Sequence, residues 1–268
     1  MSRQQDFADL HQAGCFVMPN PWDIGSAKMM AAKGAVALAT TSAGHAFTLG
    51  KPDMGHVTRD EALLHAAEIV AATPLPVNGD LENGYGDAPE TVAETIYLAG
   101  EAGLSGASIE DSTMQADALS YPFDLAVERV AAAAKAARAL GRPFTFTARA
   151  DGVMIGAYDM NEAIRRAQAF AKAGADVIYV PLPPGMDDLA RLVAAVDRPV
   201  NGLAAGPYLQ HSVADFAKSG IRRISLGSSI ARATHRVIDD AMGAMLGAGA
   251  FTPLRQSISG STVDKMLA

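Results

Sequence analysis

The chain has 268 residues, of which 49% are hydrophobic, and its formal net charge at pH 7 is −7. This length and apolar content suffice for one large core, so we expect a single domain that spans residues 1–268. The negative charge and the lack of lysine or arginine runs argue against nucleic-acid or membrane partners, whose phosphates attract a basic face.

No run of apolar residues approaches the roughly 18 needed to span a membrane, and the polar segment 2–6 lacks the apolar centre of a signal peptide. We therefore expect a cytoplasmic protein. The single cysteine, Cys15, has no second cysteine with which to form an internal disulfide. Its apolar neighbours indicate a small core residue rather than a nucleophile.

Apolar runs of strand length alternate with alanine-rich segments of helical period along most of the chain. The expected strands are residues 14–18, 36–40, 76–80, 106–110, 143–149, 177–180, 198–202 and 223–227. The expected helices are residues 24–33, 59–72, a segment starting near Pro89, 124–140, 161–173, 186–195, 213–219 and 229–246. At the start of the 59–72 helix, Thr58 and Glu61 have the spacing of a capping box.

Eight strands with a helix between each pair predict an α/β fold, a (β/α)8 TIM-type barrel. A doubly wound sheet is the alternative, but residues 19–23 lack the glycine-rich phosphate turn expected after its first strand. Residues 41–45 are expected to lie in a loop, and the polar loop 112–123 is long enough to be a lid. We expect residues 229–268 to form a helical extension whose apolar tail packs on a partner subunit.

The most informative stretch is residues 80–86, which follow a short buried strand and place Asp80 and Glu82 at its C-terminal end. The next strand also ends in two acids, Glu110 and Asp111. Carboxylates gathered at one end of a sheet repel each other unless a cation neutralises them or one stays protonated. A hard cation with oxygen ligands, Mg2+ or alternatively Mn2+, is the simplest resolution.

Catalytic groups of such barrels cluster where the strands end, so the residues at those positions form the candidate site. The set comprises Ser42, His45, Asp53, Asp80, Glu82, Glu110, Asp111, Arg149, Asp151 and Asn201. Asp80, Glu82 and Glu110 would hold Mg2+ directly or through its waters.

A turn and an arginine in this set favour an anionic substrate. Ser42 and the backbone N–H groups of Ala43 and Gly44 would bind a carboxylate, and Arg149 would add a bidentate clamp. The implied substrate is a small 2-oxo or 2-hydroxy acid.

Each of these residues also has a purely structural interpretation. Asp80 can cap a turn, Glu110 and Asp111 can cap a helix, Arg149 can form a salt bridge, and His45 can be a solvated loop residue. Charged residues at several successive strand ends are nevertheless hard to explain by packing alone, and a shared site is favoured.

Three other classes of enzyme lack the residues that they need. A Schiff-base aldolase needs a lysine at a strand end, whereas the lysines fall on expected helices or on a loop. A zinc hydrolase needs clustered histidines, and the six histidines are scattered. A phosphate-binding barrel has a glycine-rich turn after the seventh or eighth strand, for which residues 227–229 are a partial candidate.

Over nearly its whole length the chain resembles the isocitrate lyase and phosphoenolpyruvate mutase superfamily. The matching segments are Asn20-Pro21-Trp22-Asp23-Ile24-Gly25-Ser26-Ala27, Thr41-Ser42-Ala43-Gly44, Asp80-Leu81-Glu82-Asn83-Gly84-Tyr85-Gly86, Ser108-Ile109-Glu110-Asp111-Ser112, Thr147-Ala148-Arg149-Ala150-Asp151 and Arg222-Arg223-Ile224-Ser225-Leu226-Gly227. The resemblance implies a Mg2+-dependent barrel that makes or breaks a bond next to a 2-oxo acid through a metal-bound enolate. It also implies homo-oligomers, commonly dimers of dimers, in which the last barrel helix is exchanged between subunits.

The resemblance also implies roles for individual positions. The family's acidic metal ligands correspond to Asp53, Asp80, Glu82 and Glu110. The turn that binds the substrate carboxylate corresponds to Ser42, Ala43 and Gly44, and the substrate-binding arginine corresponds to Arg149. Glu82 stands where many members have aspartate. The lid 112–123 has no lysine and no cysteine, where the lyases for isocitrate and methylisocitrate carry Lys-Lys-Cys-Gly-His.

These observations lead to one expected function and two alternatives. We expect a Mg2+-dependent lyase that cleaves a carbon–carbon bond next to a 2-oxo or 2-hydroxy acid, as in oxaloacetate decarboxylation. The expected catalytic residues are Arg149, Ser42 and His45, with Ala43, Gly44, Asp80 and Asn201 also binding substrate. The alternatives are a carboxyphosphonoenolpyruvate phosphonomutase-like enzyme and a barrel that binds a 2-oxo acid without turnover.

Overall fold

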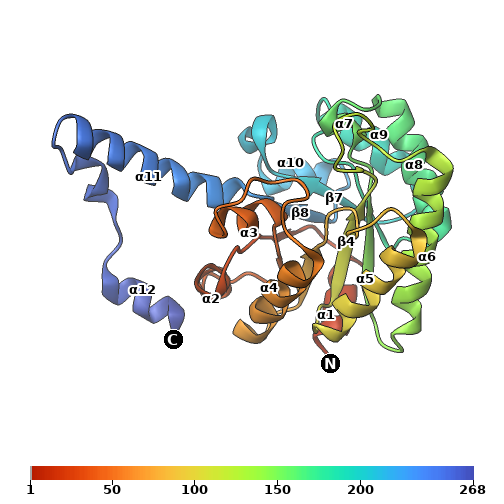
Figure 1. Cartoon of the computed structure of the whole chain (residues 1–268), viewed down its shortest axis with the longest axis horizontal. Coiled ribbons are helices and arrows are strands. Elements are labelled where there is room, and N and C mark those ends of the chain that lie inside the picture. The colour runs from red at the N-terminus through yellow and green to blue at the C-terminus, as the bar shows by residue number, and fades with distance from the viewer. Residues whose placement is uncertain (1) are drawn as a thin grey trace.

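Eight parallel strands form the centre of the protein, whose computed structural model describes residues 2–268 (Figure 1). The strands are β1 (Phe16–Met18), β2 (Leu38–Ala39), β3 (Val77–Asp80), β4 (Gly106–Glu110), β5 (Thr145–Arg149), β6 (Val177–Tyr179), β7 (Val200–Leu203) and β8 (Arg223–Ser225). Their order in the sheet is β1-β8-β7-β6-β5-β4-β3-β2, so the sheet curls into a nearly closed barrel. The predicted (β/α)8 barrel is confirmed.

β1 and β2 are the two end strands of the sheet and do not pair with each other. The gap between them, here called the seam, is closed by individual hydrogen bonds. Just past β1, the carbonyl of Pro19 accepts a hydrogen bond of 3.0 Å from the Ala39 amide. The side chain of Asn20 donates to the Thr40 carbonyl at 3.0 Å and accepts from the amides of Leu226 and Gly227 at 2.8 and 3.1 Å. One amide side chain therefore ties together the ends of β1, β2 and β8.

The helices surround the strands and continue beyond them. They are α1 (Arg3–Leu10), α2 (Ile24–Ala32), α3 (Ser42–Thr48), α4 (Arg59–Ala72), α5 (Pro89–Glu101), α6 (Phe123–Ala139), α7 (Gly152–Ile155), α8 (Met160–Ala173), α9 (Met186–Ala195), α10 (Val213–Lys218), α11 (Ser229–Gly247) and α12 (Gly260–Leu267), with two 3-10 turns at Gly206–Gln210 and Thr252–Gln256. Within residues 2–268 no helix combines the length and the apolar character needed to cross a membrane.

Most helix boundaries agree with the sequence prediction, and the exceptions have physical reasons. The capping box at the start of α4 is present, with Thr58 and Glu61 each bonding the other's backbone. The expected loop 41–45 is wrong, because Thr41 caps a helix there and accepts a hydrogen bond from the Gly44 amide. The sequence also gave no signal for α1, which is polar except for a few side chains.

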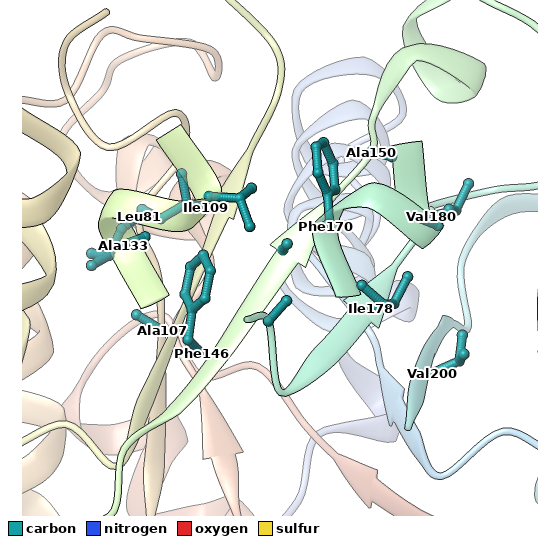
Figure 2. Close-up of a cluster of buried hydrophobic side chains, with 14 of the residues drawn as sticks. Leu81, Ala107, Ile109, Ala133, Phe146, Ala150, Phe170, Ile178, Val180 and Val200 are labelled. Atoms are coloured by element: carbon teal, nitrogen blue, oxygen red, sulfur yellow. The ribbon is translucent and has the colours of Figure 1, made fainter. Parts of the chain in front are cut away.

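Side chains alternate between the barrel interior and the layer under the helices, as the period of two in a strand requires. On β4, Ala107 and Ile109 face the helices, and Figure 2 shows them gathered with Phe146 of β5 and Ala133 of α6. Phe170 of α8 belongs to the same buried cluster. On the opposite face of several strands, polar residues such as Asn78, Glu110 and Arg149 point into the barrel, whereas β1 and β2 place Met18 and Ala39 there.

Helix α1 closes the end of the barrel opposite the strands' C-terminal ends. Phe7 is completely buried and packs in a small cluster with Met18, Ala37 and Ala39. The His11 ring meets Phe7 edge-on, with ring centroids 4.8 Å apart. A single aromatic side chain thus anchors an otherwise polar helix.

The C-terminal segment leaves the barrel and then returns. Helix α11 projects outward and α12 comes back beside α2 (Figure 1), where the Lys28 ammonium donates to the Leu267 carbonyl at 2.8 Å. Apolar side chains along α11 remain exposed, including Ile238 at 59% and Leu246 at 79%. Between α2, α11 and α12 lies an apolar cavity of about 1010 Å³.

A substitution at Gly106, the first residue of β4, tests how tightly the barrel interior is packed. A Cβ added to Gly106 would lie 2.3 Å from the Thr145 carbonyl oxygen and 3.0 Å from the Phe7 ring. We expect Gly106→Ala to lower the free energy of unfolding by about 1–3 kcal/mol, because backbone and a buried ring must both shift. Denaturant unfolding measures the loss, with Gly185→Ala as control, since nothing lies within 4 Å of its added Cβ. An unchanged unfolding midpoint for Gly106→Ala would contradict this packing.

Candidate active site

A cavity of about 210 Å³ opens at the C-terminal ends of the strands. Its volume suits a ligand of a few carbon atoms. Interior-facing strand residues and the loops that follow them line it. The lining includes Met18, Asn20, Ser42, Ala43, Asp53, Asn78, Asp80, Glu82, Ser108, Glu110, Met114, Arg149, Asp151, Tyr179, Leu182, Asn201, Arg223, Ser225, Ser229 and Arg232.

Arg149 is the centre of this cavity's charged groups. Its guanidinium lies 2.8 Å from Asp80, 2.8 Å from Glu110 and 2.7 Å from Asp151, and above the ring of Tyr179. Burial opposes its charge, but the three carboxylates outweigh burial and raise the pKa of Arg149 well above its ordinary value. One guanidinium among three carboxylates leaves an excess of negative charge, which suits a cation.

Asp80 joins this cluster to the start of α3. Its second oxygen accepts hydrogen bonds from the Ser42 amide and the Ser42 hydroxyl, both at 3.0 Å. The carboxylate therefore sits at the N-terminal end of α3, where helix amides favour negative charge. Asp80 thus adds to the Thr41 cap in satisfying the first turn of α3.

The predicted carboxylate-binding turn is only partly directed toward the cavity. Ser42 and Ala43 line it, whereas the Gly44 amide donates to the hydroxyl of Thr41 at 3.2 Å and is used within α3. Since the Ser42 hydroxyl already donates to Asp80, the donor that remains at this end of the cavity among the described residues is the Ala43 amide.

His45 lies outside the residues that line the main cavity. It is buried in α3, where its ring stacks on His65 with centroids 3.8 Å apart. Burial, followed by the repulsion from His65, lowers the pKa of His45 to about 4. The packing of a neutral His45 ring against His65 is a structural reason for a histidine at this position. The expected catalytic role of His45 stays a prediction.

Three cavity carboxyls hold their protons more tightly than usual. Burial raises the pKa of Glu82 to about 7, and it also raises the pKa of Asp53. Burial raises the pKa of Glu110 well above its ordinary value, against the attraction of Arg149. Desolvation is the largest cause in each case, and neighbouring carboxylates add to it, so a divalent cation would relieve the crowding.

The donor set fits a hard cation, although no preformed cluster exists. Among residues 2–268, no three histidine, cysteine, aspartate or glutamate side chains converge as a ready metal site. The cavity nevertheless offers carboxylate oxygens from Asp53, Asp80, Glu82 and Glu110. Mg2+ is commonly held by one or two carboxylates and several waters, so it does not require a tight protein cage.

Asp111 belongs to the support behind the cavity. It is buried, bonded by Arg166 at 2.9 Å and by the Tyr158 hydroxyl at 2.7 Å. Its other oxygen accepts from the Asp151 amide at 2.8 Å. Asp111 therefore fixes the loop that carries Asp151 rather than facing the cavity.

The strained backbone of the protein is concentrated around this cavity. Four of its lining residues, Met54, Glu82, Met114 and Leu182, have φ angles of 71°, 46°, 62° and 47°. Non-glycine residues rarely adopt such angles, and they cluster at functional sites where the surrounding structure imposes them. The strain supports a functional interpretation of the cavity.

The lid contributes an apolar group. Ser112 and Ser120 pair as a short bridge at its base. Of the described lid residues, Met114 lines the cavity. The lid therefore brings a thioether, and not an acid, toward a bound ligand.

Several lining residues were not predicted. Tyr179, Arg223 and Ser225 lie within strands, at interior-facing positions, whereas Asn20 follows β1 and Arg232 lies in the first turn of α11. The signal available in the sequence was the period of two: polar residues inside apolar strands mark the barrel interior. These positions precede the strand ends, where the predicted site residues lie.

Glu82 gives the cavity a predicted pH dependence. Burial raises the pKa of Glu82 in the folded protein to about 7, whereas a glutamate in the unfolded chain has a pKa of about 4.3. The folded state therefore favours the protonated carboxyl. This contribution to stability is fully present below about pH 4.3 and is lost as the pH rises through about 7. In chelator-containing buffer, we expect the free energy of unfolding to fall by roughly 3 kcal/mol over this window through Glu82. Glu82→Gln should remove that share of the slope in denaturant unfolding at several pH values. Glu90→Gln, at an exposed position in the first turn of α5, is the control, and equal slopes for both variants would contradict the assignment.

Comparisons with known proteins agree with the geometry. The family model described as phosphoenolpyruvate phosphomutase matches residues 7–246. The uncharacterized protein Rv1998c of Mycobacterium tuberculosis (strain ATCC 25618 / H37Rv) is 36% identical over 225 residues, 83% of this chain and 81% of that protein. An oxaloacetate decarboxylase of Pseudomonas savastanoi pv. phaseolicola is 30% identical over 214 residues, 78% of this chain and 72% of the decarboxylase.

Solved structures extend the comparison to the fold. A candidate lyase/mutase from Burkholderia cenocepacia J2315 superposes with a TM-score of 0.95 at 45% identity, covering 99% of this chain and 95% of that one. An oxaloacetate acetylhydrolase superposes with a TM-score of 0.88 at 24% identity, covering 99% and 94% of the two chains, which shows a shared fold alone. From its family model and its relatives, the chain belongs to the isocitrate lyase and phosphoenolpyruvate mutase superfamily.

Proposed function

We propose that this protein is a Mg2+-dependent lyase that cleaves the carbon–carbon bond next to a 2-oxo acid, with oxaloacetate decarboxylation as the concrete reaction. The observation that carries the choice is the lid, which offers Met114 to the cavity and no proton donor. Cleavage of isocitrate needs a positioned acid for the departing carbanion, whereas decarboxylation releases carbon dioxide and needs none.

The carboxylates of the cavity would hold the cation. Asp80, Glu82, Glu110 and Asp53 line the cavity and offer oxygen donors. Mg2+, when bound, supplies Lewis-acid stabilisation of the negative charge that develops on the 2-oxo oxygen.

The chain's own groups bind and orient the substrate. The Ala43 amide, at the start of α3, would bind the carboxylate next to the 2-oxo group, and the Ser42 hydroxyl would join it by turning its hydrogen from Asp80 to the substrate. Arg149 would donate to a substrate oxygen while Asp151 and Glu110 keep its guanidinium in place. Such donors, fixed before the reaction, stabilise developing charge without reorganising.

The reaction then balances with no further protein acid. The bond between C3 and C4 of oxaloacetate breaks, and carbon dioxide leaves. The electron pair enters a new C2–C3 double bond, which gives the enolate of pyruvate, and a proton from water finally adds to C3. The apolar side chains of Met114 and Leu182 limit water around the breaking bond.

A mutase that acts on a phosphonate is the second candidate, because the matching family model is described as phosphoenolpyruvate phosphomutase. The absence of lysine from residues 112–123 weighs against it. Phosphonopyruvate therefore belongs in the same assay.

The reaction has a direct test. We expect turnover of oxaloacetate that requires Mg2+ and stops with EDTA, and isocitrate and 2-methylisocitrate should be far poorer substrates. Arg149→Ala should lose at least about 100-fold in kcat/KM, because its positioned charge is lost and three carboxylates are left uncompensated. Arg191→Ala on α9, an exposed arginine paired with Asp188, is the control and should keep full activity.

Other outcomes would change the assignment. Efficient isocitrate cleavage would show that the lid has been misinterpreted. Tight binding of 2-oxo acids without turnover would favour a binding protein, and loss of Mg2+ binding in Asp80→Ala by calorimetry would support the metal site in either case.

We also propose that residues 229–268 pack on a partner subunit, as a dimer of dimers requires. The supporting observation is the exposed apolar surface of the segment, where Val237 is 54% and Phe251 is 69% exposed. Monomeric proteins rarely leave such a run uncovered.

Truncation tests this assembly. Deleting the residues after Gly249 removes α12 and its contact with α2, so light scattering should show a shift toward monomer or insoluble material. Lys28→Ala, which removes only the hydrogen bond to Leu267, is the milder control. A soluble truncated protein of unchanged mass per particle would show that the tail is dispensable.

A further inference from the structure

The segment that follows β3, residues 81–87, is named here the carboxylate loop because it carries Glu82. Glu82 lines the cavity of about 210 Å³, and it also lines a neighbouring cavity of about 630 Å³. Three further residues of the loop line that second cavity, namely Asn83, Tyr85 and Gly86. Because Glu82 borders open space in two directions, its position must be fixed by contacts that the rest of the loop makes.

The backbone of the carboxylate loop has an unusual conformation that needs support. Glu82 and Tyr85 have φ angles of 46° and 63°, which residues other than glycine rarely adopt unless the surrounding structure imposes them. The Glu82 carbonyl accepts a hydrogen bond from the Glu110 amide at 2.9 Å, and a carboxyl oxygen of Glu82 accepts one from the Gly55 amide at 3.2 Å. These contacts hold Glu82 itself, whereas its left-handed turn also requires that the residues after it stay in place.

Arg129 on α6 holds the part of the loop that follows Glu82. This buried side chain donates to three backbone carbonyls of the loop, those of Asn83, Gly86 and Asp87. A guanidinium presents its donors in a rigid planar fork, so one side chain fixes the spacing of the three backbone groups. Thr95 on α5 adds a hydrogen bond of 2.8 Å to the Gly84 carbonyl. Helix side chains thus replace the strand ladder that ends with β3.

Tyr121, at the end of the lid, holds the same loop through its side chain. Its hydroxyl accepts from Asn83 Nδ2 at 3.0 Å and donates to Asp87 Oδ1 at 2.7 Å. Burial raises the pKa of Tyr121 to about 12, so the hydroxyl keeps its proton at neutral pH. The Arg129 guanidinium lies over the Tyr121 ring, 3.9 Å from its centroid, in a cation–π contact. Arg129 and Tyr121 together are named here the loop clamp.

The loop clamp is also bonded to the barrel. The Tyr121 amide donates to the carbonyl of Asp111, the residue after β4, at 2.9 Å. The Tyr121 carbonyl accepts from Arg166 Nη1 at 3.0 Å, and the same atom donates to Asp111 Oδ2 at 2.9 Å. Since Glu110 is the last residue of β4, the loop clamp fixes the carboxylate loop relative to a second cavity carboxyl.

We propose that Arg129 and Tyr121 are positioning residues of the cation site, whose hydrogen bonds to residues 83–87 keep the Glu82 carboxyl in the cavity and so set its affinity for a divalent cation. The inference rests on the proposed function in one respect, that Glu82 is among the cation ligands. When the loop clamp is weakened, the left-handed turn at Glu82 relaxes and its carboxyl moves away from the other donors. Loss of a group that orients a metal ligand commonly weakens metal affinity by about 10-fold to 100-fold.

The test measures the binding of Mn2+ alone, with no substrate and no turnover. The electron paramagnetic resonance signal of free Mn2+ gives the dissociation constant. Tyr121→Phe removes only the hydroxyl that bonds Asn83 and Asp87, and it should weaken Mn2+ binding about 10-fold. Arg129→Lys keeps the positive charge but loses the planar fork, and it should weaken Mn2+ binding by at least as much.

Each variant has a matched control elsewhere in the fold. Tyr208→Phe removes a buried tyrosine hydroxyl that donates to the Pro183 carbonyl at 2.9 Å. Arg142→Lys changes an arginine that, like Arg129, donates to backbone carbonyls, those of Gly100 and Leu104. Both controls should bind Mn2+ as tightly as the unmodified protein.

A double variant shows whether the effect passes through Glu82. Glu82→Gln should weaken Mn2+ binding by itself. If Tyr121 acts by placing the Glu82 carboxyl, adding Tyr121→Phe to Glu82→Gln should change the dissociation constant by less than about 2-fold, because the two residues then act as a unit. The full loss of affinity on top of Glu82→Gln would show that Tyr121 acts by another route, and the inference would be wrong.

The outcomes separate this inference from the proposed reaction. Unchanged Mn2+ affinity in folded Tyr121→Phe and Arg129→Lys proteins overturns the inference, even if Asp80→Ala abolishes binding and oxaloacetate is decarboxylated. No Mn2+ binding by the unmodified protein overturns the inference and the proposed cation site together. Weaker binding in the loop-clamp variants alone supports the inference even if no oxaloacetate is turned over. Melting curves without metal identify a variant that fails to fold, and Tyr121→Phe, the smaller change, then decides.

Discussion

The crowding of carboxylates around Arg149 is the constraint on which the rest of the site depends. Charges this close together and this little hydrated are unfavourable unless each is matched. Asp80 is matched twice, by Arg149 on one oxygen and by the start of α3 on the other. The raised pKa of Glu110 follows from placing negative charge in a small, mostly buried space, and the positive φ of Glu82 lies in the same part of the cavity.

The cavity residues on strands are held more rigidly than those on loops. Strand residues such as Arg149 and Tyr179 are held by ladders on both sides, and their directions follow from the pleat. Loop residues such as Asp53 and Met114 have no such ladder and come from segments that can vary between relatives. The chemistry that the superfamily shares would therefore reside in the strands, and the choice of substrate would depend more on the loops.

The barrel and the acidic residues at the strand ends could be predicted because both leave patterns among residues that are close together in the sequence. The apolar periods and the capping box of Thr58 and Glu61 are local, and acids directly after a strand are visible without a structure. The helix at Ser42 was missed because its stabilising partner, Asp80, lies far away in the sequence. Arg223 was missed because its hydrogen-bond partners lie far from it in the sequence, and no local pattern reveals that a buried arginine lacks a carboxylate.

The seam beside β1 has a consequence for how the cavity wall can move. Asn20 lines the cavity and bonds the ends of β2 and β8 through its two amide atoms. Elsewhere in the barrel, neighbouring strands can separate one backbone pair at a time. Along this seam, rotation of the Asn20 side chain would break three hydrogen bonds together, one to the end of β2 and two to the end of β8. The backbone bond from the Ala39 amide to the Pro19 carbonyl would remain, so the wall is expected to loosen first at Asn20, at the cavity end, and only then at Pro19.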